Sequence, residues 1–385
     1  LNLSRLSYIN AKVLFLAVVL AVQVFLFVLI GNSVLQLKGM LLSYWFMLWV
    51  SAMLAAMVGL NISSTMQTVV SIYILIPILL VPQLLLGGAM IRFDKLNSDL
   101  SNSKYVPIVG DLMPSRWAYE GLMVQQYVGN AYQVKFYNQQ FTTSEASYRL
   151  NYYVPELKQE LSEIKNLLSS QKPNSGLLIK MQRFNNELIK MSEAVPECSE
   201  LDIRLDPNQV NVSVLMRSER LIECYRSYYI KSLSESIEAE DALYYYWENK
   251  LGGRKALLTL KEENYNESVA EIVKNKQEHV KLVVSKDEFI RKSEPIYKYP
   301  SMVLGRAHFF APVKRLGNYY FNTYWFNVVV LILMGAIFYV LLVYKVLYRL
   351  STYIKLQKIS FILINYVNRY LAVLRPKYFM KFLKK

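Results

Sequence analysis

The chain has 385 residues, of which 54% are hydrophobic, and it carries a formal net charge of +15. No charged residue occurs from Val13 to Leu37, from Gly39 to Ile91 or from Leu316 to Tyr344. These uncharged stretches exclude an ordinary soluble domain, because a helix needs only about 20 apolar residues to cross the hydrocarbon core of a membrane.

Three membrane spans are predicted in the first part of the chain, at residues 11–30, 40–60 and 68–86. The polar stretch 61–67 is expected to be a turn, so the second and third spans form an antiparallel hairpin. Pro77 and Pro82 lie inside the third span, where neighbouring groups in a membrane can satisfy the carbonyls that proline leaves free. Gly87 and Gly88 are expected to end it.

Few polar residues lie in or between these spans. Such residues either line a transport pathway or join helices through hydrogen bonds, and the sequence leaves both interpretations open. They are Gln23, Ser43, Asn61, Ser63, Ser64, Gln67, Ser71 and Gln83.

The segment 142–294 has a different composition, with 22 basic and 25 acidic residues. Apolar residues recur at helical spacing in 154–168 and 177–195, which predicts a helical hairpin. Helix-like sequence is expected to continue to about residue 292, with an interruption at Gly252 and Gly253. Cys198 and Cys224 either form a disulfide, if the compartment is oxidising, or remain free thiols.

A fourth span is predicted at residues 323–344, and a strongly basic tail follows it. All fourteen charged residues from Pro295 to the C-terminus are Lys or Arg. The positive-inside rule places this tail in the cytoplasm and the segment between the last two spans outside. The tail either lies along anionic membrane lipid or only stops transfer, and no nucleic-acid partner is expected.

No catalytic residue and no metal site are expected. The two histidines, His279 and His308, are far in sequence from each other and from the cysteines. Neither a phosphate-binding loop nor a nucleophile elbow is present.

Two motifs resemble the permease of type II ABC exporters, especially the G-type subfamily of pigment and sterol exporters. They are "IPILLVPQLLLGGAMIRFDKL" (76–96) and "MPSRWAYEGLMVQQY" (113–127). The second fits the family pattern P-x-x-[YW]-x-x-E-[AG]-[LM] at Pro114, Trp117, Glu120, Gly121 and Leu122. The resemblance covers about residues 1–135 and 320–345, and the insert at 142–310 is far larger than the usual loop.

The resemblance implies the permease part of an ATP-driven exporter that works by alternating access. The chain is then the C-terminal portion of a longer polypeptide, with ATP and Mg²⁺ bound by an upstream cassette domain and no cofactor in these residues. A second permease half, in a homodimer or heterodimer, completes the pathway. The third span would supply the candidate pathway residues Gln67, Ser71, Tyr73 and Gln83.

The same resemblance makes 113–127 an outer re-entrant segment, with Pro114, Arg116, Trp117 and Glu120 as candidate gate residues. Arg116 and Glu120 are four apart on a helix and therefore share a face on which they can pair. Simple anchoring of the helix is the alternative.

The predicted fold is an all-α polytopic membrane protein with about four transmembrane helices, outer re-entrant helices and a helical extramembrane domain. The expected parts are 1–135 (three spans and the re-entrant segment), 136–315 (the outer domain), 316–350 (the last span) and 351–385 (the cytoplasmic tail). We expect an integral protein of the plasma or inner membrane whose outer domain, periplasmic in a double-membraned bacterium, binds a partner or caps the exit. The rival interpretation is a membrane-anchored structural or interaction protein whose helical outer domain binds a partner.

Overall fold

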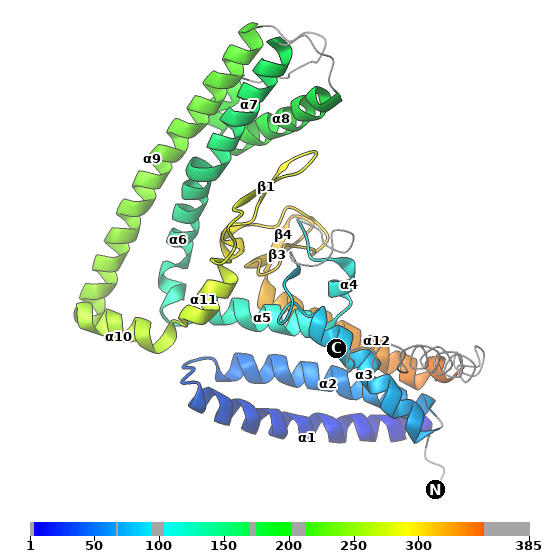
Figure 1. Ribbon diagram of the computed structural model, residues 1–385. Helices are drawn as coiled ribbons and strands as arrows, with labels where there is room; N and C mark the ends of the chain where they lie inside the picture. The colour runs from blue at the N-terminus through cyan, green and yellow to red at the C-terminus, as the bar shows by residue number, and fades with distance from the viewer. Residues whose placement is uncertain (1–3, 67, 94–103, 170–174, 202–211, 350–385) are drawn as a thin grey trace, which may run out of the picture.

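The computed structural model describes residues 4–66, 68–93, 104–169, 175–201 and 212–349. These residues form a largely helical protein with a layer of apolar helices and a long helical arm that projects from it (Figure 1). Two short β-hairpins lie between the arm and the apolar helices. The prediction of an all-α membrane protein is confirmed.

Four apolar helices correspond to the predicted spans: α1 (Arg5–Val34), α2 (Leu41–Thr65), α3 (Val69–Leu85) and α12 (Thr323–Val343). Within the described residues, α1, α2 and α12 are long and apolar enough to cross a membrane. Helix α3 has 17 residues, which is about 25 Å at 1.5 Å per residue and slightly less than the hydrocarbon thickness. Three of the four predicted spans, α1, α2 and α12, therefore have full length, whereas α3 is short.

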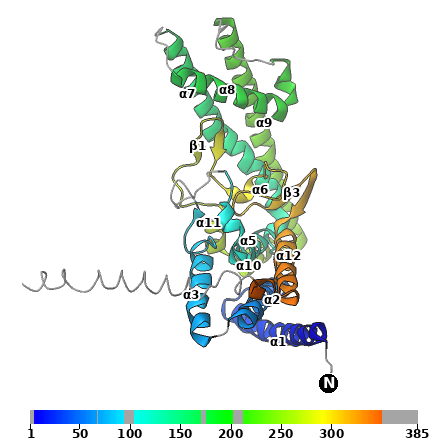
Figure 2. The same cartoon turned by 90° about the vertical axis from the view of Figure 1, so that its right-hand side faces the viewer.

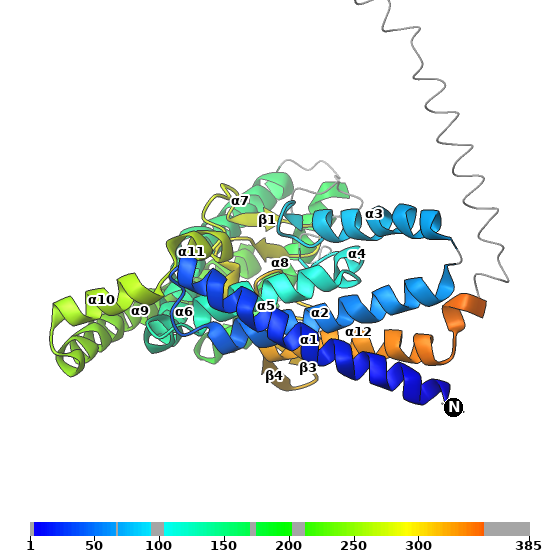
Figure 3. The same ribbon diagram turned by 90° about the horizontal axis from the view of Figure 1, so that it is seen from below.

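Helices α1, α2 and α12 pack together through apolar contacts and a few hydrogen bonds. The indole nitrogens of Trp45 and Trp49 donate to the carbonyls of Ala21 (2.9 Å) and Ala17 (3.0 Å), which fastens α2 to α1. Helix α3 stands apart from this layer (Figures 2 and 3). None of its residues is buried, and its main packing partner is the next long helix, α5.

The predicted turn at 61–67 is wrong over most of its length, because α2 continues to Thr65. The side-chain amide of Asn61 donates to the carbonyls of Met57 (2.8 Å) and Phe338 (2.8 Å). Because both N–H groups of the Asn61 amide find acceptors, one on its own helix and one on α12, the chain can remain helical at this position. Asn61 therefore joins two helices and lies buried between them.

Helix α3 ends at the two glycines that the sequence indicated. Gly88 has a φ of +80°, and a Cβ there would lie 2.6 Å from the ring of Phe309, so only glycine fits. Two further helices follow, α4 (Ile108–Asp111) and α5 (Pro114–Val128). Helix α5 packs beside the first turns of α2 and α12.

The junction between α5 and the arm is tightly bonded. Asn130 is buried, and its amide donates to the carbonyls of Gln126 (2.9 Å) and Tyr127 (2.7 Å). Its side-chain oxygen accepts from the backbone amides of Tyr132 (3.1 Å) and Gln133 (2.7 Å). One side chain thus ends α5 and begins α6.

We call 133–251 the helical arm. It contains α6 (Gln133–Tyr148), a π-helical turn η2 (Arg149–Tyr153), α7 (Val154–Ser169), α8 (Ser175–Ala194), the 3₁₀ turn η3 (Pro196–Leu201) and α9 (Val212–Leu251). The apolar residues at helical spacing meet in one core, which includes Leu157, Ile164, Phe184, Leu188 and Tyr225. Helices α10 (Arg254–Asn264) and α11 (Glu267–Val273) return the chain to α5, after a break at Gly252 and Gly253.

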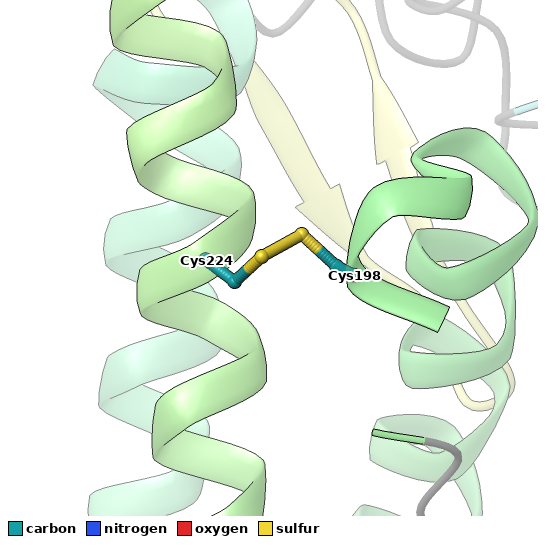
Figure 4. The surroundings of a disulfide bond; sticks show 2 residues. All are labelled: Cys198 and Cys224. Carbon is teal, nitrogen blue, oxygen red and sulfur yellow. A yellow bond between two sulfur atoms is a disulfide. The ribbon is translucent and has the colours of Figure 1, made fainter. Parts of the chain in front are cut away.

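A disulfide closes the arm. It joins Cys198 in η3 to Cys224 in α9, across 26 positions in the sequence (Figure 4). The bond holds the end of α8 against α9.

The expectation of helix up to about residue 292 is wrong beyond Val273. The chain forms the antiparallel hairpin β1 (Leu282–Val284) and β2 (Phe289–Arg291), the turn η4 (Pro295–Tyr297), and a second hairpin of β3 (Val313–Leu316) and β4 (Tyr319–Asn322). Val283 pairs with Ile290, and β-branched residues of this kind favour strands. The second hairpin leads directly into α12. The predicted tail 351–385 lies outside the described residues.

Candidate functional site

The motif 113–127 forms α5, and local chemistry explains its start and its end. Pro114 occupies the first turn, where its missing N–H costs nothing. The helix stops at Gly129, whose amide donates to the carbonyl of Gln125 (2.8 Å). Nine of its residues are buried, two of them charged: Arg116 and Glu120.

Glu120 is the centre of a buried polar cluster, and its relative exposure is 0%. One carboxylate oxygen accepts from Lys314 Nζ at 2.7 Å. The other accepts from Asn327 Nδ2 at 3.1 Å and lies 3.5 Å from Arg116 Nη1. The carboxylate thus connects α5, β3 and α12, which are distant in the sequence.

Arg116 extends the cluster toward α4. Its Nη2 lies 3.5 Å from Asp111 Oδ1, and its guanidinium stacks 3.9 Å from the centre of the Trp117 ring. Arg306 Nε donates to the other oxygen of Asp111 at 2.9 Å. Arg116 Nε and Nη1 have no hydrogen-bond acceptor among the described residues.

We define the gate cluster as Asp111, Arg116, Glu120, Arg306, Lys314 and Asn327. It holds three cations and two carboxylates, so one positive charge is left over. Burial, and to a lesser degree the charge of Arg116, lower the pKa of Lys314 to about 8 despite the carboxylate of Glu120. Opposite charges in this environment attract strongly, but each would be costly to leave without its partner.

Trp117 fixes α5 to its neighbours on both sides. Its indole nitrogen donates to the carbonyl of Asp111 (2.7 Å), and its own carbonyl accepts from Asn327 (2.9 Å). Gly121 lies one turn further along, where a Cβ would approach Met47 Cε to 2.5 Å. The four candidate gate residues therefore lie on one helix, and three of them contact the cluster directly or form part of it.

The candidate pathway residues are spread along α3 and do not form one site. The hydroxyl of Ser71 is hydrogen-bonded to that of Thr68 (2.7 Å) in the first turn, and Tyr73 is 70% exposed. Gln83 lies in the last turn, where its backbone carbonyl accepts from Ser115 (2.7 Å). Gln67 lies outside the described residues.

The sequence predictions missed Asp111, Arg306, Lys314 and Asn327. A weak signal existed for two of them. Asn327 is a polar residue in an apolar stretch near the start of the last span, and Lys314 lies in "APVKRLG" a few residues before it. Nothing local indicated that both would meet Glu120. Among the residues that the structure describes, no group of His, Cys, Asp and Glu is arranged to hold a metal ion.

These observations define a helical membrane protein with a charged cluster beside the first turns of its apolar helices. Residues 1–127 match the family model described as ABC-2 type transporter. The matched segment includes α1–α3 and ends one residue before the end of α5, and the match supports an ABC type II permease domain in this part of the chain. The predicted resemblance is confirmed for this segment.

The family implies association with an ATP-binding cassette component and pairing of two permease domains. No curated protein and no solved structure matches the chain significantly. The helical arm and the two β-hairpins lie beyond the matched residues.

Proposed function

We propose that the chain is the membrane-spanning permease part of an ATP-driven ABC exporter. One observation carries the proposal: the matched segment folds into α1–α3 and α5, and α12 from the far end of the chain completes the packing of α2 and α5. ATP hydrolysis by the cassette component would drive alternating access, and this chain would supply the walls of the pathway.

Helix α3 is the proposed pathway wall. It presents exposed side chains along its whole length, and Ser71, Tyr73 and Gln83 supply polar groups at its two ends. A second permease half would cover this surface. Its apolar composition is suited to an apolar or amphipathic substrate, because charged groups are costly in this environment.

Two observations support an orientation with the arm outside and the C-terminus in the cytoplasm, as an exporter of this family would have. Basic residues without any acid follow α12, which favours a cytoplasmic C-terminus. The disulfide in the arm favours an oxidising compartment for the segment between α3 and α12. The arm would then lie outside, where it could bind a partner or cover the exit.

The gate cluster is proposed as the outer closure of the pathway. Glu120 of α5 is bonded to two other segments at once, β3 and α12, so a movement of α5 away from α12 must break its contact with Asn327 or with Lys314. Such a cluster favours two discrete positions of α5, one with all partners in place and one without.

Cross-linking of α3 tests the paired arrangement. Tyr73→Cys is expected to cross-link two copies of the purified full-length protein, and ATP with vanadate is expected to change the yield. Phe15→Cys on α1, with 68% exposure against 70% for Tyr73, is the matched control and should not cross-link. The two native cysteines, Cys198 and Cys224, form a disulfide with each other and therefore do not take part in the cross-linking. Cross-linking through Phe15→Cys alone, with no vanadate-sensitive ATP hydrolysis by the complex, would contradict the proposal.

A further inference from the structure

A cavity of about 290 Å³ lies outside the gate cluster, next to the residues that follow α3. We call it the outer pocket. Its walls come from four parts of the chain: residues 88–93 with 104–106, Tyr119 of α5, α11 with the residues after it, and residues 291–298 with 308–310. The volume is near the lower end of the range for small-molecule sites.

One part of the wall is aromatic. Phe93 and Phe309 meet edge to face with 4.9 Å between their ring centres, and Phe310 is 4.1 Å from Phe309. Tyr105 and Tyr119 also line the pocket. These rings offer a surface for an apolar or aromatic group.

The other part of the wall is basic. Among the residues that the structure describes, five Lys or Arg side chains line the pocket, and Glu271 is the one acidic residue that does so. Three of the five have acidic partners elsewhere. Arg92 is paired with Glu278, Lys104 with Glu288, and Arg291 with Glu145.

Lys298 differs from these three. It is partly buried, and its side-chain ammonium forms no hydrogen bond or ion pair with any described residue. Burial and then the charges of Arg291, Lys292 and Lys104 lower its pKa to about 8, although the carboxylate of Glu145 acts in the opposite direction. A cation near three other cations, with no hydrogen-bond acceptor of its own and only the more distant charge of Glu145 against it, is unfavourable unless an anion compensates it.

His308 does not add to this charge. It is partly buried against the same wall, its Nε2 donates to the carbonyl of Pro295 at 2.7 Å, and desolvation holds its pKa well below the usual value. The imidazole is therefore neutral at pH 7, with Nδ1 left as an acceptor. Lys298 is the group that selects the charge of a ligand.

We propose that the outer pocket binds an anion with an apolar body, such as a fatty acid or an anionic amphiphile. The acid group would pair with Lys298, and the apolar body would lie against Phe93 and Phe309. This site is separate from the α3 pathway, and the proposal does not depend on transport.

Protection of Lys298 from an amine-reactive reagent tests the proposal. The full-length protein is placed in phosphatidylcholine nanodiscs, treated with an acetylating reagent at pH 7.5, and the modification of each lysine is measured by mass spectrometry. Octanoate is expected to protect Lys298 and to leave Lys231, which is 78% exposed, unchanged. Octanol, which has no charge, should not protect. Equal protection by octanol, or none by octanoate or by an anionic lipid, would overturn the proposal.

Two further arms separate the sources of the anion. Protection in phosphatidylglycerol nanodiscs without octanoate would identify a lipid headgroup as the ligand, whereas protection by octanoate alone would identify a soluble amphiphile. Inorganic phosphate as effective as octanoate would refute the requirement for an apolar body.

A variant gives a second readout. Lys298→Met is expected to weaken octanoate binding about tenfold or more, measured by the shift that octanoate causes in thermal unfolding, because a charge-assisted hydrogen bond is lost. Lys231→Met is the matched control and should bind like the parent protein. An unchanged octanoate shift in Lys298→Met would overturn the proposal. If that variant does not fold, the protection experiment on the unmodified chain still decides.

Discussion

Replacement of Glu120 by glutamine changes one charge and almost no volume. The carboxylate now faces Lys314 at 2.7 Å and Arg116 at 3.5 Å, and both cations are buried. With glutamine, these cations remain in place without a shared counter-charge. Removal of one partner of a buried ion pair typically costs about 3–5 kcal/mol, so Glu120→Gln should destabilise the protein by an amount in this range.

A second substitution shows whether charge is the cause. Lys314→Met in the Glu120→Gln background removes one of the stranded cations and leaves Arg116 near Asp111 at 3.5 Å. The double variant should therefore be more stable than Glu120→Gln alone. Glu235→Gln is the control, because Glu235 is 66% exposed and lies 3.9 Å from Lys231. It should not change stability measurably.

Thermal unfolding of the full-length protein in nanodiscs measures these differences. Tryptophan fluorescence follows the unfolding, and one of the five tryptophans, Trp117, stacks on Arg116 of the cluster. The reasoning fails if Glu120→Gln unfolds at the same midpoint as the parent protein. It also fails if the added Lys314→Met substitution lowers the midpoint of Glu120→Gln further.

Three further predictions concern Lys314, the disulfide and Asn61. Because the pKa of Lys314 falls from 10.5 to about 8, the unfolded chain binds more protons between these values. The free energy of unfolding should therefore increase as pH rises from about 8 to 10.5. The same measurement on Lys314→Met should not show this increase. Loss of the disulfide in Cys198→Ser/Cys224→Ser, which spans 26 positions, should destabilise the arm by about 3 kcal/mol, and reductant should lower the midpoint of the parent protein but not of the variant. Asn61→Leu should cost about 1 kcal/mol by removing the bond to Phe338, and unchanged unfolding would argue against that bond.

The apolar helices were predictable because lipid imposes a local rule. A backbone in hydrocarbon must satisfy its own hydrogen bonds, so an uncharged run of sufficient length forms a helix whatever its neighbours are. The ends were less predictable. Asn61 looked like part of a turn, but its partner on α12 keeps it helical.

Two of the six residues of the gate cluster were predictable from the sequence. Arg116 and Glu120 lie on one helix, where a spacing of four indicates a pair. Lys314 and Asn327 lie about 200 positions further along, and only the packing of β3 and α12 on α5 brings them to the carboxylate. The outer pocket is built from four separated parts of the chain, so periodicity and spacing contain no signal for it.

The short β-hairpins were missed for a related reason. Strands of three or four residues are too brief to establish an alternating pattern, and their neighbours in the sequence are charged. In the folded hairpin Lys314 pairs with Phe321, and its side chain reaches Glu120.

The junction at Asn130 makes the arm a lever. Both ends of the arm return to α5, directly at α6 and through α10 and α11 at the other end, so α5 cannot tilt without carrying the arm along. Helix α9 alone has 40 residues and is about 60 Å long. A rotation of α5 by about 5° would sweep the far tip through about 5 Å, so a small motion among the apolar helices becomes a displacement that a molecule on the other side can sense.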